Sequence, residues 1–297
     1  MISYRIAVLS DVHASLTALD AVLRALDAFA PLDAILVAGD LTYGPSQSAT
    51  VARLREYNVK AVRGNGDVDL LNFVDGKMPA YMESLDQFAL IRWSRANTNV
   101  ETLDYLRQLP EQLVFSLPGA DFIRMVHGST QDVNESQSPE KNPGALEREM
   151  STIKEPVLVF GHTHQPLKKI TNGKLALNPG AVSMAIGIPM TAYFAVLEWL
   201  ENTAYWQAKH YHIPYSPESY KQEFVTSGLL NVAPLGPLLL ATSETGKSLG
   251  VDFMHYALAM KKRAGCGELP YIPDEIWSQA QKTFTLVRNY GSRDGEL

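Results

Sequence analysis

The sequence predicts an α/β protein of two stacked mixed β-sheets flanked by helices, followed by a C-terminal helical extension. Three observations support this prediction. Short apolar runs alternate with stretches of helical period in the first third, hairpin patterns follow Pro110, and the helical period returns after Pro214. Such an order of elements is typical of layered α/β architectures.

The first third reads as strand, helix, strand, helix, strand. The expected strands are 4–10, 34–39 and 59–64, and the expected helices are 15–29 and 48–57. A βαβαβ unit implies parallel strands joined by right-handed crossovers. Ser15 is a plausible N-cap for the first helix because its hydroxyl can accept a hydrogen bond from the backbone of the first turn.

The next region, residues 67–110, reads as a largely helical insert that packs beside the sheet. Hairpins follow it, one around Pro118-Gly119 and one around Asn172-Gly173, which is typical of a type I′ turn. Two further strands are expected at 191–200 and 203–213. A sheet pattern that begins parallel and ends antiparallel favours two mixed sheets.

We therefore divide the chain into a catalytic domain, residues 1–213, and a C-terminal helical extension, residues 214–297. The extension is rich in Pro and Gly at its start and is expected to pack on or near the first domain.

Composition excludes several classes of protein. With 46% hydrophobic and 20% charged residues, the chain resembles ordinary globular proteins. A net charge of −6 argues against a nucleic-acid partner, and the chain contains neither a long apolar run nor a leader-like start, so no membrane partner is expected. The single Cys266 indicates a reducing, cytoplasmic location. A homo-oligomer is compatible with the sequence.

Polar side chains able to bind metal follow five of the apolar strands. Carboxyl ends of parallel strands converge on one rim of a sheet, where α/β proteins bind ligands. Two more histidines lie two residues beyond the first and last of these positions, within reach of the same site. The candidate ligands are Asp11, His13, Asp40, Asn65, His127, His162 and His164.

Any one of these residues has a structural explanation, since a lone Asp often caps a helix and a lone His is usually a hydrogen-bonded side chain. The joint pattern is not explained by capping, and it holds four of the seven histidines. Seven donors are too many for one tetrahedral zinc and fit two divalent ions. Oxygen and imidazole donors favour manganese, iron, zinc or nickel.

These residues stand in blocks that resemble the signature of the calcineurin-like metallophosphoesterase superfamily, from residue 4 to about 212. The context of the second and third blocks is most similar to the bacterial small-phosphodiesterase or diadenosine-tetraphosphatase-like branch. The blocks are Asp11-Val12-His13, Gly39-Asp40, Gly64-Asn65-Gly66-Asp67, His127-Gly128 and Gly161-His162-Thr163-His164.

The resemblance implies a four-layer α/β/β/α sandwich and a division of the ligands between two metals. One metal would take Asp11, His13, Asp40 and His164, and the other Asp40, Asn65, His127 and His162, with Asp40 as the bridge. The resemblance also marks Asp40, Asn65 and His127 as the catalytic residues.

One block departs from the family pattern, because Gly66 stands where relatives commonly carry a histidine that assists the leaving group. Asp67 is then expected to cap the following turn. His210 and His212 are alternatives for the missing acid, although a structural role on their strand is favoured. Asn178 is expected to support the His164 loop.

The function implied by the resemblance is hydrolysis of small phosphodiesters or nucleotides through attack of a metal-bridging hydroxide on phosphorus. The expected partner is a small phosphorylated substrate. The alternatives are a phosphomonoesterase or protein phosphatase, and a non-catalytic metal-binding scaffold.

Overall fold

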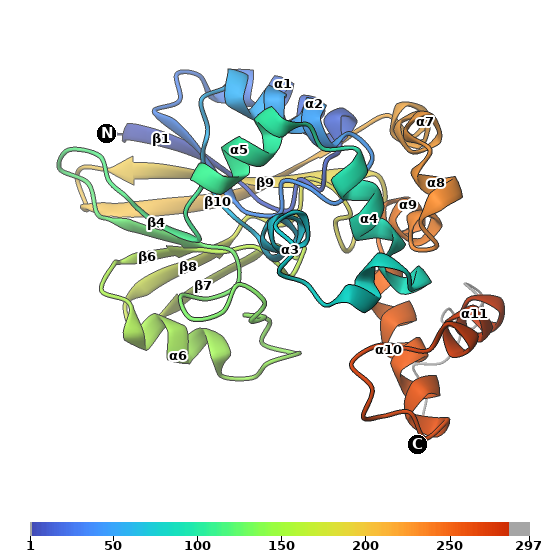
Figure 1. Cartoon of the computed structure of the whole chain (residues 1–297). Coiled ribbons are helices and arrows are strands. Elements are labelled where there is room, and N and C mark those ends of the chain that lie inside the picture. The colour runs from blue at the N-terminus through green and yellow to red at the C-terminus, as the bar shows by residue number, and fades with distance from the viewer. Residues whose placement is uncertain (1, 285–297) are drawn as a thin grey trace.

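The computed structural model describes residues 2–284 and consists of four layers, with helices on both outer faces of two stacked sheets (Figure 1). Each sheet has five strands, in the orders β10-β9-β1-β2-β3 and β4-β5-β6-β8-β7. The strands of the first sheet are β1 (Ile2–Leu9), β2 (Ala34–Ala38), β3 (Lys60–Val62), β9 (Thr191–Leu200) and β10 (Tyr205–Pro214). The strands of the second are β4 (Gln112–Phe115), β5 (Ile123–Val126), β6 (Val157–Val159), β7 (Leu167–Thr171) and β8 (Lys174–Asn178).

Both sheets are mixed, as the sequence predicted. In the first sheet β1, β2 and β3 run parallel, and β9 and β10 are added antiparallel beside β1. In the second sheet β5, β6 and β8 run parallel, and β4 and β7 form antiparallel hairpins with β5 and β8. The predicted turn between β7 and β8 is confirmed, because Asn172 and Gly173 both have the positive φ that a type I′ turn requires.

The helices lie mainly outside the two sheets. Figure 1 shows α1 and α2 over the first sheet and α6 under the second. The N-cap of α1 is Ser15, as predicted, since its hydroxyl accepts a hydrogen bond from the Ala18 N–H (3.2 Å). The helices are α1 (Leu16–Leu26), α2 (Gln47–Glu56), α3 (Asn65–Val74), α4 (Ala89–Ala96), α5 (Val100–Gln108), α6 (Ala145–Thr152), α7 (Pro217–Ser227), α8 (Leu229–Val232), α9 (Gly236–Thr245), α10 (Leu249–Arg263) and α11 (Asp274–Thr283).

One of the hydrophobic cores fills the space between the sheets. Val8 and Leu36 of the first sheet pack in one cluster with Met125 and Val159 of the second, and all four are fully buried. Burial of apolar area of this kind is the dominant favourable term in folding, so it holds the two sheets face to face. Along residues 2–284, no helix is both long and apolar enough to cross a membrane.

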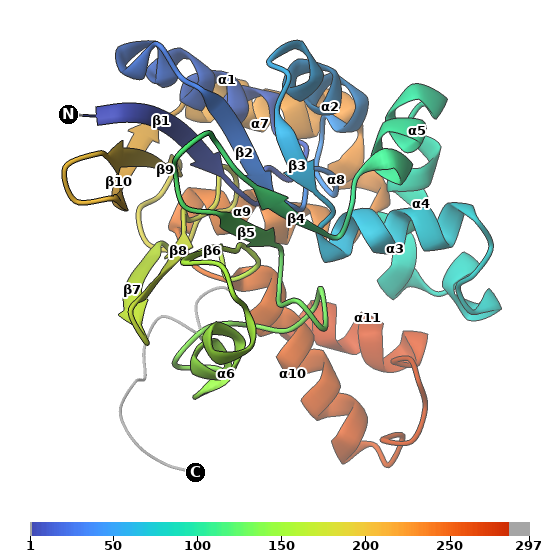
Figure 2. The ribbon, with the colours of Figure 1, turned by 90° about the vertical axis from the view of Figure 1, so that its left-hand side faces the viewer.

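The C-terminal helices contact two different parts of the rest of the chain. Helices α7 to α9 contribute to the core above the first sheet, through Tyr220 and Phe224 among others. Helices α10 and α11 form a small core of their own around Trp277. The segment between α10 and α11 packs on the insert, where Gln87 and Ile272 exchange two hydrogen bonds (2.6 and 3.1 Å). Figure 2 shows these two helices below α3 and α4.

The loop 181–190 connects the C-terminal helices to the carboxyl end of β1. On one side, the Ser183 N–H donates to the backbone oxygen of Asp11 (3.1 Å). On the other, the Ser183 hydroxyl is hydrogen-bonded to the Tyr220 hydroxyl (2.9 Å), which also meets the Ser243 hydroxyl (2.8 Å). The Met190 N–H donates to the Ser243 backbone oxygen (2.8 Å). The loop is thus held from both sides.

We predict that Tyr220→Phe lowers the free energy of unfolding by about 1–3 kcal/mol, because it removes the partner shared by two buried serine hydroxyls. Urea denaturation of metal-free protein measures this change. Tyr57→Phe is the matched control, since Tyr57 is exposed and its change should stay within about 0.5 kcal/mol. Equal stabilities of the two variants would contradict the role given to the Tyr220 hydroxyl.

Candidate metal centre

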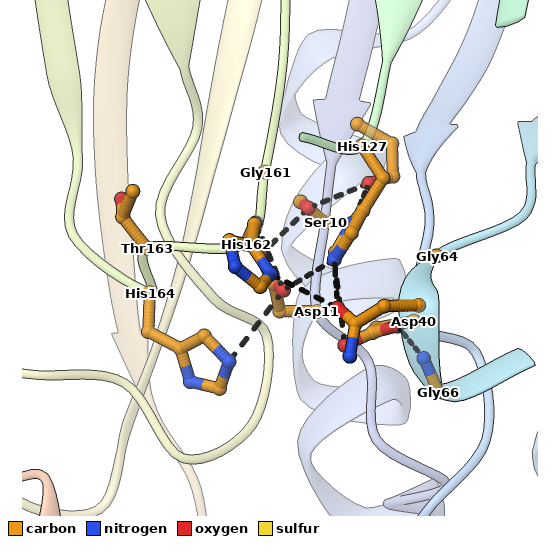
Figure 3. Close-up of polar contacts among 12 residues, drawn as sticks. Ser10, Asp11, Asp40, Gly64, Gly66, His127, Gly161, His162, Thr163 and His164 are labelled. Atoms are coloured by element: carbon orange, nitrogen blue, oxygen red, sulfur yellow. Dashed lines mark hydrogen bonds and ion pairs between the residues drawn. The ribbon is translucent and has the colours of Figure 1, made fainter. Parts of the chain in front are cut away.

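The seven candidate ligands lie at the edge where the carboxyl ends of both sheets meet. Asp11 and Asp40 follow β1 and β2, His127 follows β5, and His162 lies beyond β6 (Figure 3). Asn65 is the first residue of α3, shortly after the end of β3. The sequence predicted one rim. The structure shows that this rim is shared by two sheets, because the strands that carry His127 and His162 belong to the second sheet.

The backbone turns sharply at most of these residues. Asp11, His13, Asp40, His162 and His164 all have φ values between 45° and 67°. This left-handed region is uncommon for residues other than glycine, and such conformations cluster at functional sites because the surrounding structure must impose them. The turns keep the five side chains at the rim.

Two glycines make room for the carboxylates. A Cβ atom at Gly64 would lie 2.1 Å from Asp40 Oδ1, and one at Gly161 would lie 1.9 Å from the Ser10 hydroxyl and 3.0 Å from Asp11 Oδ2. Only glycine permits this approach of backbone to side chain. The glycines of the third and fifth sequence blocks therefore have a steric explanation.

The side chains form two close groups around the carboxylates. Asp40 Oδ2 lies 3.7 Å from His13 Nε2 and 3.4 Å from His127 Nε2. Asp11 Oδ1 lies 3.5 Å from His164 Nε2 and 3.9 Å from His127 Nε2. Asp11, His13 and His164 form one group of donor atoms within 4.8 Å of one another, and Asp11, Asp40 and His127 form the other.

The two remaining candidates join the group around His127. Asn65 Oδ1 lies 3.1 Å from His127 Nε2 and 2.9 Å from His162 Nδ1. In the other group, His13 Nε2 and His164 Nε2 are 3.0 Å apart. The structure therefore brings all seven sequence-predicted residues together.

Both carboxylates are held by neighbouring donors. Asp11 Oδ2 accepts from the Ser10 hydroxyl (2.7 Å), and both Asp11 oxygens face the His162 N–H (3.2 Å each). Asp40 Oδ1 accepts from the Gly66 N–H (2.8 Å). These bonds leave Asp11 Oδ1 and Asp40 Oδ2 facing the imidazoles.

Two histidines are oriented through their second ring nitrogen. His127 Nδ1 lies 2.8 Å from the Ala38 backbone oxygen, and His164 Nδ1 lies 2.9 Å from the Met184 backbone oxygen. A carbonyl only accepts, so each Nδ1 carries a hydrogen, and Nε2 is the ring nitrogen that faces the group. Metal-binding histidines are commonly fixed in this way.

Asp67 has a larger role than the predicted cap. It accepts from the Gly64 N–H at the start of α3 (3.0 Å), which confirms the capping prediction. It also accepts from the N–H groups of Leu41 and Thr42 (3.1 and 3.0 Å) and from the Thr42 hydroxyl (2.7 Å). Because these residues directly follow Asp40, Asp67 fixes the loop that carries this ligand.

Asn178 supports the histidine loop, as the sequence predicted. Its amide nitrogen donates to the Gly161 backbone oxygen (2.7 Å) and to the Thr163 hydroxyl (3.1 Å). His210 does not join the site, because its Nε2 bonds the backbone oxygen of Asn178 (2.7 Å). His212 packs against the ring of Tyr193 instead. A structural role for His210 and His212 is therefore favoured over an acid role in the site.

The pKa values of the carboxylates and imidazoles in the site depend strongly on one another. Burial lowers the pKa of His127, but Asp40 and Asp11 outweigh burial and raise that pKa to about 10. Burial would raise the pKa of Asp40, yet His127 and His13 keep it well below its usual range. For His13 burial dominates and lowers the pKa to about 4. In the absence of a cation, a proton on His127 thus balances the carboxylates.

This donor set fits divalent cations. Two buried carboxylates, an amide oxygen and four imidazoles converge without a lysine or arginine among the described residues that reach them. The buried Nδ1 of His13 has no hydrogen-bond partner among residues 2–284. Hard and borderline cations prefer such oxygen and nitrogen ligands.

Tyr43 lies over Gly66, a contact that no local pattern in the sequence indicates. A Cβ atom at Gly66 would be 3.1 Å from Tyr43 Cδ2 and 3.3 Å from Asp40 Oδ1. The ring of Tyr43 packs on the insert with Phe73. Its ring therefore borders the space that a side chain at position 66 would need.

Known proteins resemble this chain over most of its length. Residues 4–201 match the family model of the calcineurin-like phosphoesterase superfamily domain. A metallophosphoesterase from Sphaerobacter thermophilus is 25% identical, over 82% of this chain and 100% of that chain, with a TM-score of 0.64. A hypothetical protein from Pyrococcus horikoshii shares the fold at 21% identity, over 82% and 99% of the two chains, with a TM-score of 0.68.

An uncharacterized protein of Methanocaldococcus jannaschii is 29% identical over 194 residues, which are 61% of this chain and 71% of that protein. The family model covers more than half of the chain and spans every residue of the candidate metal centre. The chain belongs to the calcineurin-like phosphoesterase superfamily.

Proposed function

We propose that the protein is a dinuclear metal-dependent phosphodiesterase that hydrolyses small phosphodiesters or nucleotides. The observation that carries the proposal is the position of the Asp40 carboxylate, whose Oδ2 lies 3.7 Å from His13 Nε2 and 3.4 Å from His127 Nε2. A carboxylate between two groups of imidazoles is the arrangement that a bridging ligand needs.

The proposed division of the ligands is the one that the resemblance to the superfamily implies. Asp11, His13, Asp40 and His164 would hold one ion, and Asp40, Asn65, His127 and His162 the other. The short distances from Asn65 Oδ1 to the His127 and His162 rings support the second set, and the 3.0 Å approach of His13 and His164 supports the first.

Two divalent cations, when bound, would activate a shared water as the nucleophile and neutralise charge on the phosphoryl oxygens. The chain's own residues supply the positioning. Asp67 and the Gly66 N–H fix Asp40, and Ser10 with the His162 N–H fixes Asp11. Ligands fixed in advance need little reorganisation during the reaction, and this lowers its barrier.

The absence of a histidine at Gly66 defines the substrates that we expect. Without a positioned general acid, a leaving group that needs a proton loses a factor of about 10² to 10⁴ in rate, whereas one that leaves as a stable anion loses much less. The proposed activity is therefore best assayed with activated esters, whose leaving groups depart as stable anions. A monoesterase and a metal-binding scaffold are the competing proposals.

Two chromogenic esters test the substrate preference and the metal requirement. Metal-reloaded protein should hydrolyse bis-p-nitrophenyl phosphate faster than p-nitrophenyl phosphate, and manganese, iron, zinc and nickel should be tried in turn. Faster monoester hydrolysis would replace the proposal with a monoesterase. Failure of both esters with every metal would favour the scaffold.

Substitution of His127 tests its role as a metal ligand. His127→Ala should lower kcat/KM by more than about 100-fold. Even the loss of a residue that only supports a metal ligand lowers metal affinity or activity by about 10- to 100-fold. Metal analysis of the dialysed protein should show about one ion lost per chain. His255→Ala is the control, because His255 is exposed on α10 and should change neither value. A variant that keeps both ions would remove His127 from the ligand set.

Substitution of Gly66 tests whether the site tolerates a side chain at this position. Gly66→His alone should lower kcat/KM by about 10- to 100-fold, because the new side chain must displace Tyr43 or Asp40, and small displacements of reacting groups are costly. Gly267→His is the matched control, since open space surrounds Gly267. Adding Tyr43→Ala to Gly66→His should restore part of the loss. Unchanged activity in Gly66→His would show that the site tolerates a side chain there.

A further inference from the structure

A pocket of about 160 Å³ lies beside the candidate metal centre and shares none of its seven proposed ligands. It is formed between residues 137–140, in the segment that follows His127, and Phe160, Thr163 and residues 165–167, in the segment that follows β6. Thr163 lines it from between His162 and His164, and its side chain points away from the two carboxylates (Figure 3). The pocket and the metal centre are thus on opposite sides of one short loop.

The wall of this pocket contains an unsatisfied polar side chain. Gln137 is 1% exposed, and neither its amide nitrogen nor its amide oxygen has a hydrogen-bond partner among the described residues. Buried polar groups are nearly always paired, so an unpaired carboxamide calls for an explanation. A bound group that offers a donor and an acceptor would supply the missing partners.

The rest of the lining indicates an uncharged ring rather than a phosphate. Phe160, Pro166 and Leu167 provide apolar walls, and Glu140 adds a carboxylate that would repel an anion. Among the described residues that line the pocket, none is Lys or Arg. A cavity of about 150 Å³ accepts benzene, so this one is of the size for a single aromatic ring.

We propose that this pocket binds a nucleobase-like ring of the substrate and that Gln137 is its specificity residue. A carboxamide presents one donor and one acceptor side by side, and so does the edge of a pyrimidine base. The amide atoms are covered in this structure, so the ring binds with a change of the Gln137 side-chain rotamer. This inference rests on the proposed function and names its substrate class.

The test compares two diesters with the same leaving group on metal-loaded, full-length protein. Thymidine 5′-phosphate p-nitrophenyl ester carries the ring, and methyl p-nitrophenyl phosphate does not. Wild-type protein should prefer the nucleotide ester in kcat/KM. Gln137→Leu should lower the ratio of the two kcat/KM values by about 5- to 30-fold, the factor expected for the loss of one or two hydrogen bonds, through a higher KM for the nucleotide ester.

Gln131→Leu is the matched control, because Gln131 is an exposed glutamine in the same segment and lies outside the pocket lining. It should leave the ratio unchanged. A wild-type preference that Gln137→Leu does not alter, or no preference at all, would overturn the pocket proposal while leaving phosphodiester hydrolysis intact.

A second measurement separates the two proposals if neither ester is hydrolysed. Thymidine has no phosphoester, so its binding by saturation-transfer NMR does not depend on the chemistry. Binding that is weakened in Gln137→Leu and kept in Gln131→Leu would support the pocket even if the proposed reaction fails. Equal thymidine signals from all three proteins would reject it.

Discussion

The burial of two carboxylates at one edge of the fold is the constraint on which the rest of the site depends. Asp11 is fully buried and Asp40 nearly so. A buried charge is costly unless hydrogen bonds and opposite charges satisfy it. Here Ser10, the backbone N–H groups of His162 and Gly66, and the imidazoles of His13, His127 and His164 meet that requirement. The positive φ angles and the two close glycines are consequences of bringing these groups together.

The site is also joined to parts of the chain that lie far from it in sequence. The loop 181–190 contacts the backbone of Asp11 and of His164, and it is held on its other side by Tyr220 and Ser243 of the C-terminal helices. Residues 4–201 match the family model, so Tyr220 and Ser243 lie beyond the matched region. A displacement of these helices would therefore reach Asp11 through Ser183.

The surroundings of Gly66 relate a departure from the family pattern to packing. Tyr43 lies against this glycine and also contacts the hydrophobic cluster of the insert. The Tyr43 ring thus lies where a side chain at position 66 would have to fit, and glycine leaves room for it. Replacement of the glycine alone would disturb Asp40, whose Oδ1 lies 3.3 Å from the position of the new Cβ.

The sequence by itself determined the features that depend on residues close together in the chain. The parallel β1-β2-β3 unit, the Ser15 cap and the Asn172-Gly173 turn follow from local periodicity and local hydrogen bonding. The seven donors could be found because strand ends and short spacings mark them, and the tertiary structure brings them together. Tertiary structure alone decided that the rim belongs to two sheets, that Asp67 holds the Asp40 loop, and that Gln137 is buried without a partner. Each of these depends on contacts between residues distant in the chain, which no local pattern specifies.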